Sequence, residues 1–388
     1  MAAMTAFTFR APPRIVSEIG GIGRLGEFAQ ELGMRRPLIV CDPGIAACGI
    51  AAQAIEALRR AGLEAQLFDA VEADPPAAMV RRAVEAAGRG EADGIVGLGG
   101  GSSLDTAKVV ALLARSGQDI DAIYGVDRAR GGRLPLIQVP TTAGTGSEIT
   151  WVSVITCESL EKKAVYAPQL LPDLALLDAG LSAGMPPRVT AATALDAMVH
   201  AIEAYTSRTK KNPVADALAR KALALLAGKL PRVLEEGRDL EARAAVLEGA
   251  MLAGMAFVNA SVAAIHGLAY PLGARFHVPH GHANALVMGP VLRFNLKAAT
   301  RLYAELAPCV LPGREFASDA EAAAAFVAAM EAMAGGGGLA TRMSHFGVTE
   351  ADIPSMADEV VSEIQRLIAT NPCDMSFEDV CAIYRAVL

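Results

Sequence analysis

Asp196 and His200 are two residues of this 388-residue chain whose types and spacing suggest metal chemistry. They lie four positions apart in an alanine-rich run without proline, so a helix there would project both from one face. Further along, His266 and His280 lie in segments apolar enough to be buried. One carboxylate with two or three histidines suits a divalent cation that keeps an open coordination position, and Fe²⁺, Zn²⁺ and Mn²⁺ all accept such donors.

A plainer interpretation of these residues needs no metal. An Asp/His pair on a helix is often a surface ion pair or a cap, and a single buried histidine is usually only hydrogen-bonded. The clustering favours the metal site, because the chain has six histidines and five of them fall between Thr193 and Asn284. Burying so many polar groups without a ligand would be costly.

A glycine-rich turn from Gly97 to Lys108 offers a second kind of chemistry. It follows an apolar run and opens a helical one, so its backbone amides and the helix N-terminus could hold a diphosphate. Its spacing is not G-x-G-x-x-G, and glycine turns are common in α/β proteins. A second small, hydroxyl-rich loop from Val139 to Glu148 ends another apolar run. Two such loops on one sheet edge suit a dinucleotide better than one does.

Asp42 ends an earlier apolar run. An acidic side chain at this point of a dinucleotide-binding unit accepts hydrogen bonds from the adenosine ribose and repels a 2′-phosphate, which favours NAD over NADP. The alternative is that Asp42-Pro43-Gly44 is only a turn with a local side-chain contact.

The elements that would position these residues differ between the two parts of the chain. Up to about Asp178, short β-type runs alternate with helical runs, which predicts a largely parallel, doubly wound sheet with its ligand at the carboxyl ends of the strands. We expect strands at 37–41, 65–68, 94–98 and 136–139, and helices at 50–61, 76–88 and 102–114.

From Leu181 onward the periodicity becomes helical, and Pro186-Pro187 fits a domain junction. The prediction is therefore an α/β dinucleotide-binding domain over residues 1–184 and an all-helical bundle over residues 185–388. Expected helices are 189–206, 213–230, 240–260, 283–294, a run to Ala334 with Asp319 as its N-cap, and 377–388.

Composition excludes several classes of protein. The net charge of −7 without a basic block argues against a nucleic-acid partner. No apolar run reaches transmembrane length, and the N-terminus has no secretory pattern. The six cysteines show no disulfide or zinc-finger rhythm, so we expect reduced thiols in a cytoplasmic protein.

Taken together, these motifs resemble the iron-containing alcohol dehydrogenase family, which includes lactaldehyde reductases and propanediol dehydrogenases. The similarity lies in the glycine turn with Asp105 and Lys108, the loop that begins at Pro140, and the residues around Asp196 and His266. It extends to Pro279-His280-Gly281 and to the C-terminal Asn371-Pro372 and Glu378-Asp379, and so covers nearly the whole chain.

The resemblance implies a fold like that of dehydroquinate synthase, with nicotinamide and a small alcohol or aldehyde in the cleft between the domains, and commonly a dimer. It implies Fe²⁺ bound by Asp196, His200, His266 and His280. It also implies that Lys162 lies near the nicotinamide, although Lys162-Lys163 could equally be a solvated pair. The cofactor contacts it implies, together with those expected from the motifs, are Asp42, Gly99, Gly100, Gly101, Ser102, Asp105, Thr141, Thr142, Thr145, Lys162 and Leu181.

The chain departs from the family pattern in three places. Tyr270 stands where many members have a histidine assigned to a proton path, and tyrosine titrates far above neutral pH unless strongly perturbed. His277 and His282 are additional imidazoles, and His277 is our candidate for the missing proton shuttle. Ala194 stands where the family usually has glycine, which should not prevent metal binding.

Two rival functions use the same residues. A metal- and NAD-dependent lyase of the dehydroquinate synthase type would need several basic residues for a phosphorylated substrate, and near the histidine motifs only Arg275 is available. A metallohydrolase would leave the glycine turn unexplained. We therefore expect an NAD-dependent alcohol dehydrogenase or aldehyde reductase in which the metal acts as a Lewis acid.

Overall fold

The computed structural model describes residues 6–159 and 161–388, and they form two compact units. One unit is Ala11–Gly184, and the other contains Met185–Leu388. The predicted division placed everything before residue 185 in one domain. Arg10, however, groups with the helical unit, because its amide donates to Asn259 Oδ1 at 2.8 Å and its carbonyl accepts from Asn259 Nδ2 at 2.9 Å.

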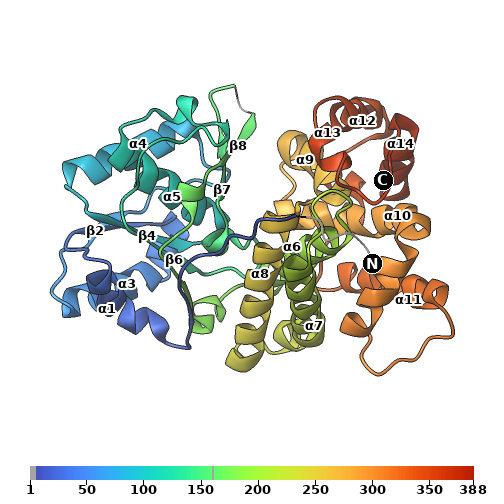
Figure 1. Cartoon of the computed structure of the whole chain (residues 1–388), viewed down its shortest axis with the longest axis horizontal. Helices are drawn as coiled ribbons and strands as arrows, with labels where there is room; N and C mark the ends of the chain where they lie inside the picture. The colour runs from blue at the N-terminus through green and yellow to red at the C-terminus, as the bar shows by residue number, and fades with distance from the viewer. Residues whose placement is uncertain (1–5, 160) are drawn as a thin grey trace. The chain divides into compact units, whose positions relative to one another are not determined.

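The first unit is built on a parallel sheet (Figure 1). Its six strands lie in the order β1-β9-β6-β4-β2-β3, and every pair in it is parallel. The predicted parallel sheet is thus confirmed. The strands are β1 (Ile15–Ser17), β2 (Pro37–Val40), β3 (Gln66–Phe68), β4 (Gly94–Gly99), β6 (Leu136–Pro140) and β9 (Leu174–Leu177).

Helices cover both faces of this sheet because its central strands are apolar on both sides. In β2, Leu38 and Val40 pack into one buried cluster with α4 and α5, whereas Ile39 packs into another with α1 and α3. This alternation is what a doubly wound sheet requires. The helices are α1 (Leu25–Glu31), α2 (Pro43–Ala47), α3 (Ile50–Arg60), α4 (Ala77–Arg89) and α5 (Gly101–Ser116).

A small second sheet was not expected from the sequence. It has the order β5-β8-β7, with β5 (Gly125–Val126) parallel to β8 (Lys162–Tyr166) and β7 (Val152–Thr156) antiparallel to β8. Strand β1, at one edge of the main sheet, and its neighbour β9 were also missed.

The second unit is helical, as predicted (Figure 1). Pro231 did not end its helix where expected: α7 continues to Glu235, and Val233 in the extra turn is buried. Ser318, not Asp319, is the N-cap of α11, since its side chain accepts from the Glu321 amide. The helices are α6 (Pro187–Thr206), α7 (Pro213–Glu235), α8 (Leu240–Ala260), α9 (Ala264–Phe276), α10 (His280–Val310), α11 (Asp319–Ala334), α12 (Ile353–Ser362), α13 (Gln365–Ile368) and α14 (Phe377–Ala386).

Helix length and composition decide whether a helix could cross a membrane. Within the described residues, no single helix is long and apolar enough to cross a membrane. One pair among the described helices, α8 and α9, reaches the required length and composition when taken together, and its two helices are bent by 104° relative to each other.

Candidate metal centre and nucleotide cradle

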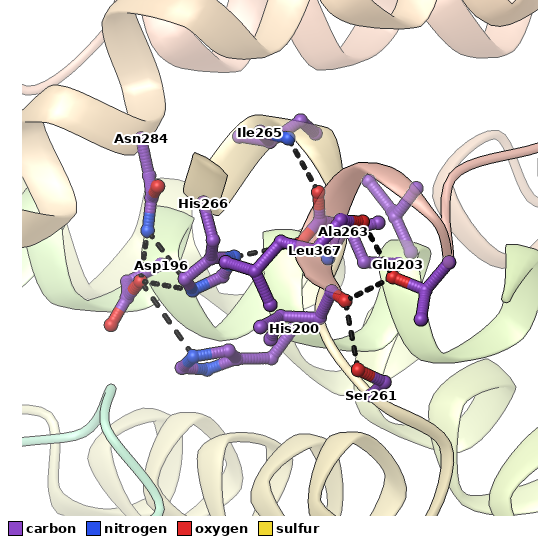
Figure 2. A network of polar contacts seen from close by, with 12 residues as sticks. Asp196, His200, Glu203, Ser261, Ala263, Ile265, His266, Asn284 and Leu367 are labelled. Carbon is purple, nitrogen blue, oxygen red and sulfur yellow. Dashed lines mark hydrogen bonds and ion pairs between the residues drawn. The ribbon is translucent and has the colours of Figure 1, made fainter. Parts of the chain in front are cut away.

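Three imidazoles of the helical unit converge on one oxygen of the Asp196 carboxylate. Helix α6 carries Asp196 and His200 on one face, α9 carries His266 in its first turn, and His280 is the first residue of α10. Asp196 Oδ1 lies 3.9 Å from His200 Nε2, 3.7 Å from His266 Nε2 and 3.6 Å from His280 Nε2. Figure 2 shows Asp196, His200 and His266 turned toward the same point. The structure therefore brings together the four predicted ligands.

This geometry fits a metal ion. Four donors about 2.1 Å from a tetrahedral ion are separated from one another by about 3.4 Å, close to the distances found here. Asp196, His200 and His266 are buried, and their donor atoms lie within 4.8 Å of one another. The His280 side chain is 44% exposed, so the group of ligands meets solvent on that side. An open side is what a catalytic metal centre needs.

The surroundings keep Asp196 ionised. Burial alone would raise the pKa of its carboxyl. The attraction of His200, His280 and His266 and a hydrogen bond from Asn284 outweigh burial, so the pKa of Asp196 lies below its ordinary value. A metal ligand must be deprotonated, and Asp196 meets that condition.

Two residues of the centre were not predicted. Asn284, one helical turn after His280, donates from Nδ2 to Asp196 Oδ1 at 2.6 Å and lies 3.2 Å from His266 Nε2. Glu203, on α6, accepts from His266 Nδ1 at 2.7 Å. Their spacing on α10 and α6, one turn beyond a ligand, was the available signal, but the sequence alone does not show which way their side chains point.

Close packing of helices brings His280 to the other ligands. A Cβ added to Gly281 would lie 2.3 Å from the Ala192 carbonyl oxygen of α6, so only glycine permits this approach. The His200 ring stacks on Phe257 with 4.2 Å between centroids and on His266 with 4.8 Å. Phe257 therefore packs against a predicted ligand.

Tyr270, His277 and His282, at which the chain departs from the family pattern, lie in different places. The Tyr270 ring is 39% exposed, and its centroid lies 6.2 Å from that of His280. His277 is exposed at the C-cap of α9, with a positive φ of 54°. His282 is buried and donates from Nε2 to the Ala340 carbonyl at 2.7 Å, a structural role. Tyr270 is thus placed beside a ligand, and shuttling by His277 stays a prediction.

The glycine turn and the hydroxyl-rich loop lie side by side in the α/β unit. Strands β4 and β6 are neighbours, with Gly99 paired to Pro140, so both loops leave the same edge of the sheet. The Thr141 amide donates to the Gly99 carbonyl at 2.9 Å. A Cβ added to Gly101 would lie 2.9 Å from Thr145 Cγ2, and one added to Gly100 would contact Thr142 at 3.5 Å. The two loops are thus adjacent, as the predicted cradle requires, and their binding of a nucleotide stays a prediction.

The start of α5 within this cradle suits an anion. Its N-cap, Gly100, makes no side-chain capping bond, and Gly101 and Ser102 form the first turn. Such amides have no partner within the helix and attract negative charge. Gly99 has a φ of 142°, which favours glycine, and a Cβ there would lie 2.8 Å from Ser103 Oγ.

Asp42 and Asp105 support the cradle through contacts within the protein. Asp42 Oδ1 accepts from the amides of Gly44 and Ile45, so the local turn contact does form, and Oδ2 accepts from Ser103 Oγ at 3.3 Å. Asp105 Oδ2 accepts from the Val154 amide at 2.8 Å and Oδ1 from Ser147 Oγ at 2.5 Å. Both Asp105 oxygens thus accept hydrogen bonds from protein groups. Asp105 therefore supports the cradle indirectly, whereas a direct contact with the cofactor was expected.

Lys162 and Leu181 are less closely tied to the cradle. Lys162 Nζ forms an ion pair with Asp74 at 2.7 Å and is 36% exposed, which corresponds to the solvated alternative. Leu181 is buried in the cluster beneath α1 and α3. Their roles beside the cofactor stay predictions.

A buried ionic network fixes the hydroxyl-rich loop. Lys108 is fully buried, and its Nζ donates to Ser147 Oγ at 2.8 Å, Thr150 Oγ1 at 3.0 Å and the Val152 carbonyl at 2.8 Å. Burial lowers the pKa of Lys108. Burial raises the pKa of neighbouring Glu148 to about 7.

The raised pKa of Glu148 predicts a pH-dependent gain from Glu148→Gln. Between pH 4.5 and 7 the native state keeps a proton that the unfolded chain loses, so wild-type stability falls as pH rises through this window. Glutamine carries no such penalty. At pH 8 we expect the variant to be more stable by up to about 3 kcal/mol, with the difference vanishing near pH 4.5.

Urea unfolding followed by the fluorescence of Trp151 would measure this gain, because Trp151 is the only tryptophan and lies in this unit. Glu64→Gln, which changes an exposed acid in the same unit, is the matched control and should show no pH-dependent gain. Equal stability of wild type and Glu148→Gln at pH 8 would contradict the prediction.

Known proteins match this chain along its whole length. The model of the iron-containing alcohol dehydrogenases matches residues 12–179, and that of the C-terminal domain of the same family matches residues 190–388. Long-chain-alcohol dehydrogenase 1 of Geobacillus thermodenitrificans is 36% identical over 95% of this chain and 93% of its own length.

Solved structures agree with the sequence matches. A 1,3-propanediol oxidoreductase superposes with a TM-score of 0.95 at 33% identity, over 99% of this chain and 100% of its own. The sulfoacetaldehyde reductase of Bifidobacterium kashiwanohense, solved with NAD⁺, does so with 0.88 at 26% identity, over 99% of each chain. The chain belongs to the iron-containing alcohol dehydrogenase family.

Proposed function

We propose that this protein is an NAD-dependent alcohol dehydrogenase that interconverts a small alcohol or diol with its aldehyde, using iron. The convergence of three imidazole nitrogens on Asp196 Oδ1 carries the proposal. The same donors would also accept Zn²⁺ or Mn²⁺. A lyase of the dehydroquinate synthase type is not favoured, since the family models that match both parts of the chain are those of alcohol dehydrogenases.

The two groups supply complementary chemistry: the metal ion is a Lewis acid toward the alcohol or carbonyl oxygen, and the nicotinamide takes or gives the hydride. Asp196, His200, His266 and His280 would hold the ion. The amides at the start of α5 would hold the diphosphate of NAD, with Thr141, Thr142 and Thr145 as hydroxyl donors. The Tyr270 ring lies near that of His280, and its hydroxyl would exchange hydrogen bonds with a substrate hydroxyl or with water.

A spectrophotometric assay tests this function. Protein stripped by a chelator and reloaded with Fe²⁺ or Zn²⁺ should produce NADH from NAD⁺ with at least one alcohol of a panel of primary alcohols, 1,2-propanediol and 1,3-propanediol. The stripped protein should be inactive, and a second portion reloaded with Mg²⁺ is the control. Failure of every alcohol, and of the matching aldehydes with NADH, would refute the proposal.

Cofactor choice should depend on the Asp42 charge. Asp42→Asn keeps an oxygen to accept from the Gly44 and Ile45 amides but removes the charge that repels a 2′-phosphate. We expect NADP⁺ to bind about tenfold more tightly than to wild type, a change of about 1.4 kcal/mol. Titration of both nucleotides measures this. Unchanged NADP⁺ affinity would place Asp42 away from the ribose and leave it only the helix-capping role.

We also propose a cytoplasmic homodimer or higher homo-oligomer. The family commonly forms dimers, and the six cysteines are free thiols, as expected for a reducing compartment. Sedimentation velocity over a range of protein concentrations tests the assembly, and a monomer throughout that range would refute it.

A further inference from the structure

Glu203 is a buried carboxylate that no part of the proposed reaction uses. It lies on α6, almost one turn beyond His200, and is 3% exposed. It accepts three hydrogen bonds: from the Ala263 amide at 2.7 Å, the Ile265 amide at 2.6 Å and His266 Nδ1 at 2.7 Å. Figure 2 shows its carboxylate facing the start of α9. One side chain thus holds both a metal ligand and the backbone beside it.

The backbone at this point needs an acceptor from elsewhere. The first amides of a helix have no partner within it. Ala263, the N-cap of α9, provides no side-chain cap, and the preceding Ser261 has a φ of 94°, so the chain turns sharply between α8 and α9. Glu203, on α6, accepts hydrogen bonds from two of these amides. Its negative charge also suits the positive end of the α9 dipole.

The third bond determines which nitrogen of His266 carries the proton. A carboxylate only accepts, so Nδ1 must carry a hydrogen to bond with Glu203 Oε2 at 2.7 Å. The other nitrogen, Nε2, then keeps its lone pair and lies 3.7 Å from Asp196 Oδ1, on the side where the four ligands meet. A second hydrogen bond of this kind usually orients and tunes a ligating histidine.

We propose that Glu203 is a positioning residue that presets His266 for metal binding by fixing both its tautomer and the start of the helix that carries it. This inference rests on the proposed metal centre. It assigns Glu203 no contact with substrate or nicotinamide.

An amide in place of this carboxylate cannot satisfy the same neighbours, because all three of them are donors. If the side-chain oxygen of the Glu203→Gln variant faces Ala263 and His266, its NH₂ group meets the Ile265 amide hydrogen. If the oxygen faces Ile265, the NH₂ group meets the Ala263 amide, and His266 must move its proton to Nε2, the atom that should bind the metal. In either orientation at least one of the three donors loses its acceptor, so the arrangement that presents His266 Nε2 to the metal is weakened.

Metal affinity is therefore the test, and it needs no catalytic assay. Zn²⁺ binding to the full-length chain, measured by competition with a chromophoric chelator, should be 10- to 100-fold weaker in Glu203→Gln than in wild type. Asp178→Asn is the matched control. Its carboxylate is also buried and accepts three amides, those of Gly20, Ile22 and Gly180, but it lies in the α/β unit and contacts no imidazole. Zn²⁺ affinity should be unchanged in this control.

The tautomer gives a second, spectroscopic readout. The chain has six histidines. The ring ¹⁵N signals of His266 are identified as those that are absent from the spectrum of His266→Gln. We expect the Nδ1–H form in wild type, and its loss or mixing with the Nε2–H form in Glu203→Gln. Glu203→Asp keeps the charge and should retain the Nδ1–H form with an intermediate Zn²⁺ affinity. If Glu203→Gln does not fold, Glu203→Asp alone is decisive.

Several results would overturn this inference: Zn²⁺ affinity of Glu203→Gln within twofold of wild type, an Nε2–H form in wild type, or wild-type affinity in Glu203→Asp when the glutamine variant does not fold. The proposed metal centre fails in a different way, since wild type itself would then bind no Zn²⁺. A tight wild-type site with an unaffected Glu203→Gln would refute only the role of Glu203.

Discussion

Asp196→Ala should remove nearly all bound metal and reduce kcat/KM by about 10³-fold. Asp196 Oδ1 lies within 3.9 Å of all three imidazole nitrogens. Without it, the ion would be bound by the three imidazoles alone, with no anionic ligand. Lewis-acid stabilisation is worth several kcal/mol, and each 1.36 kcal/mol is a factor of ten in rate. Elemental analysis of the purified chain and steady-state rates with the best alcohol would measure both effects.

Asp216→Ala is the control for this experiment. Asp216 is a partly buried carboxylate of the same unit, on α7, where it pairs with Lys211 Nζ at 2.8 Å. Its loss changes charge and burial without touching an imidazole of the centre, so metal content should stay at the wild-type level. An Asp196→Ala protein that retains its metal, or a rate within tenfold of wild type, would show that the ion binds elsewhere.

Gly99→Ala should weaken NAD⁺ binding by about 100-fold while leaving metal affinity unchanged. A side chain at φ 142° is strained, and its Cβ would lie 2.8 Å from Ser103 Oγ and 3.3 Å from Asp42 Oδ2. The turn must then shift, at a cost of about 1–3 kcal/mol, and that displaces the amides that face the diphosphate. Isothermal titration with NAD⁺ and, separately, with Zn²⁺ would distinguish the two units.

Gly88→Ala is the matched control, because Gly88 lies on helix α4 of the same unit and a Cβ there meets nothing within 4 Å. It should bind NAD⁺ as wild type does. If Gly99→Ala also kept wild-type affinity, the cradle would have to be sought on another edge of the sheet. A loss of Zn²⁺ affinity in Gly99→Ala would instead indicate general misfolding.

A local pattern was enough to place Asp196 and His200 together, whereas the full set with His266 and His280 came from the resemblance to the family. Asp196 and His200 are related by one helical turn, so their common face follows from periodicity. The central strands were predictable for a similar reason: runs such as 37–40 are apolar on both faces and are flanked by helical sequence. Both predictions depend only on residues near one another in the chain.

What could not be predicted depends on distant segments. Glu203 contacts His266 across 63 positions, and its place one turn beyond a ligand does not show which way its side chain points. The sequence did not show the bond of Asp105 to the Val154 amide or that of Lys162 to Asp74, and the cofactor contact assigned to Lys162 by resemblance stays a prediction. Strand β1 is three residues long and becomes a strand only by pairing with β9, more than a hundred residues away.

The assembly of the centre from three helices has a consequence for biosynthesis. Asp196 and Asn284 are 88 residues apart, and both donors that enter last, His266 and His280, leave the ribosome long after α6. An ion that reaches the nascent chain early finds only Asp196 and His200. The four-donor site is therefore complete only once α10 has been synthesised, and in the finished chain the hydrogen bonds of Glu203 and Asn284, together with packing, join α6 to α9 and α10 without any contribution from an ion.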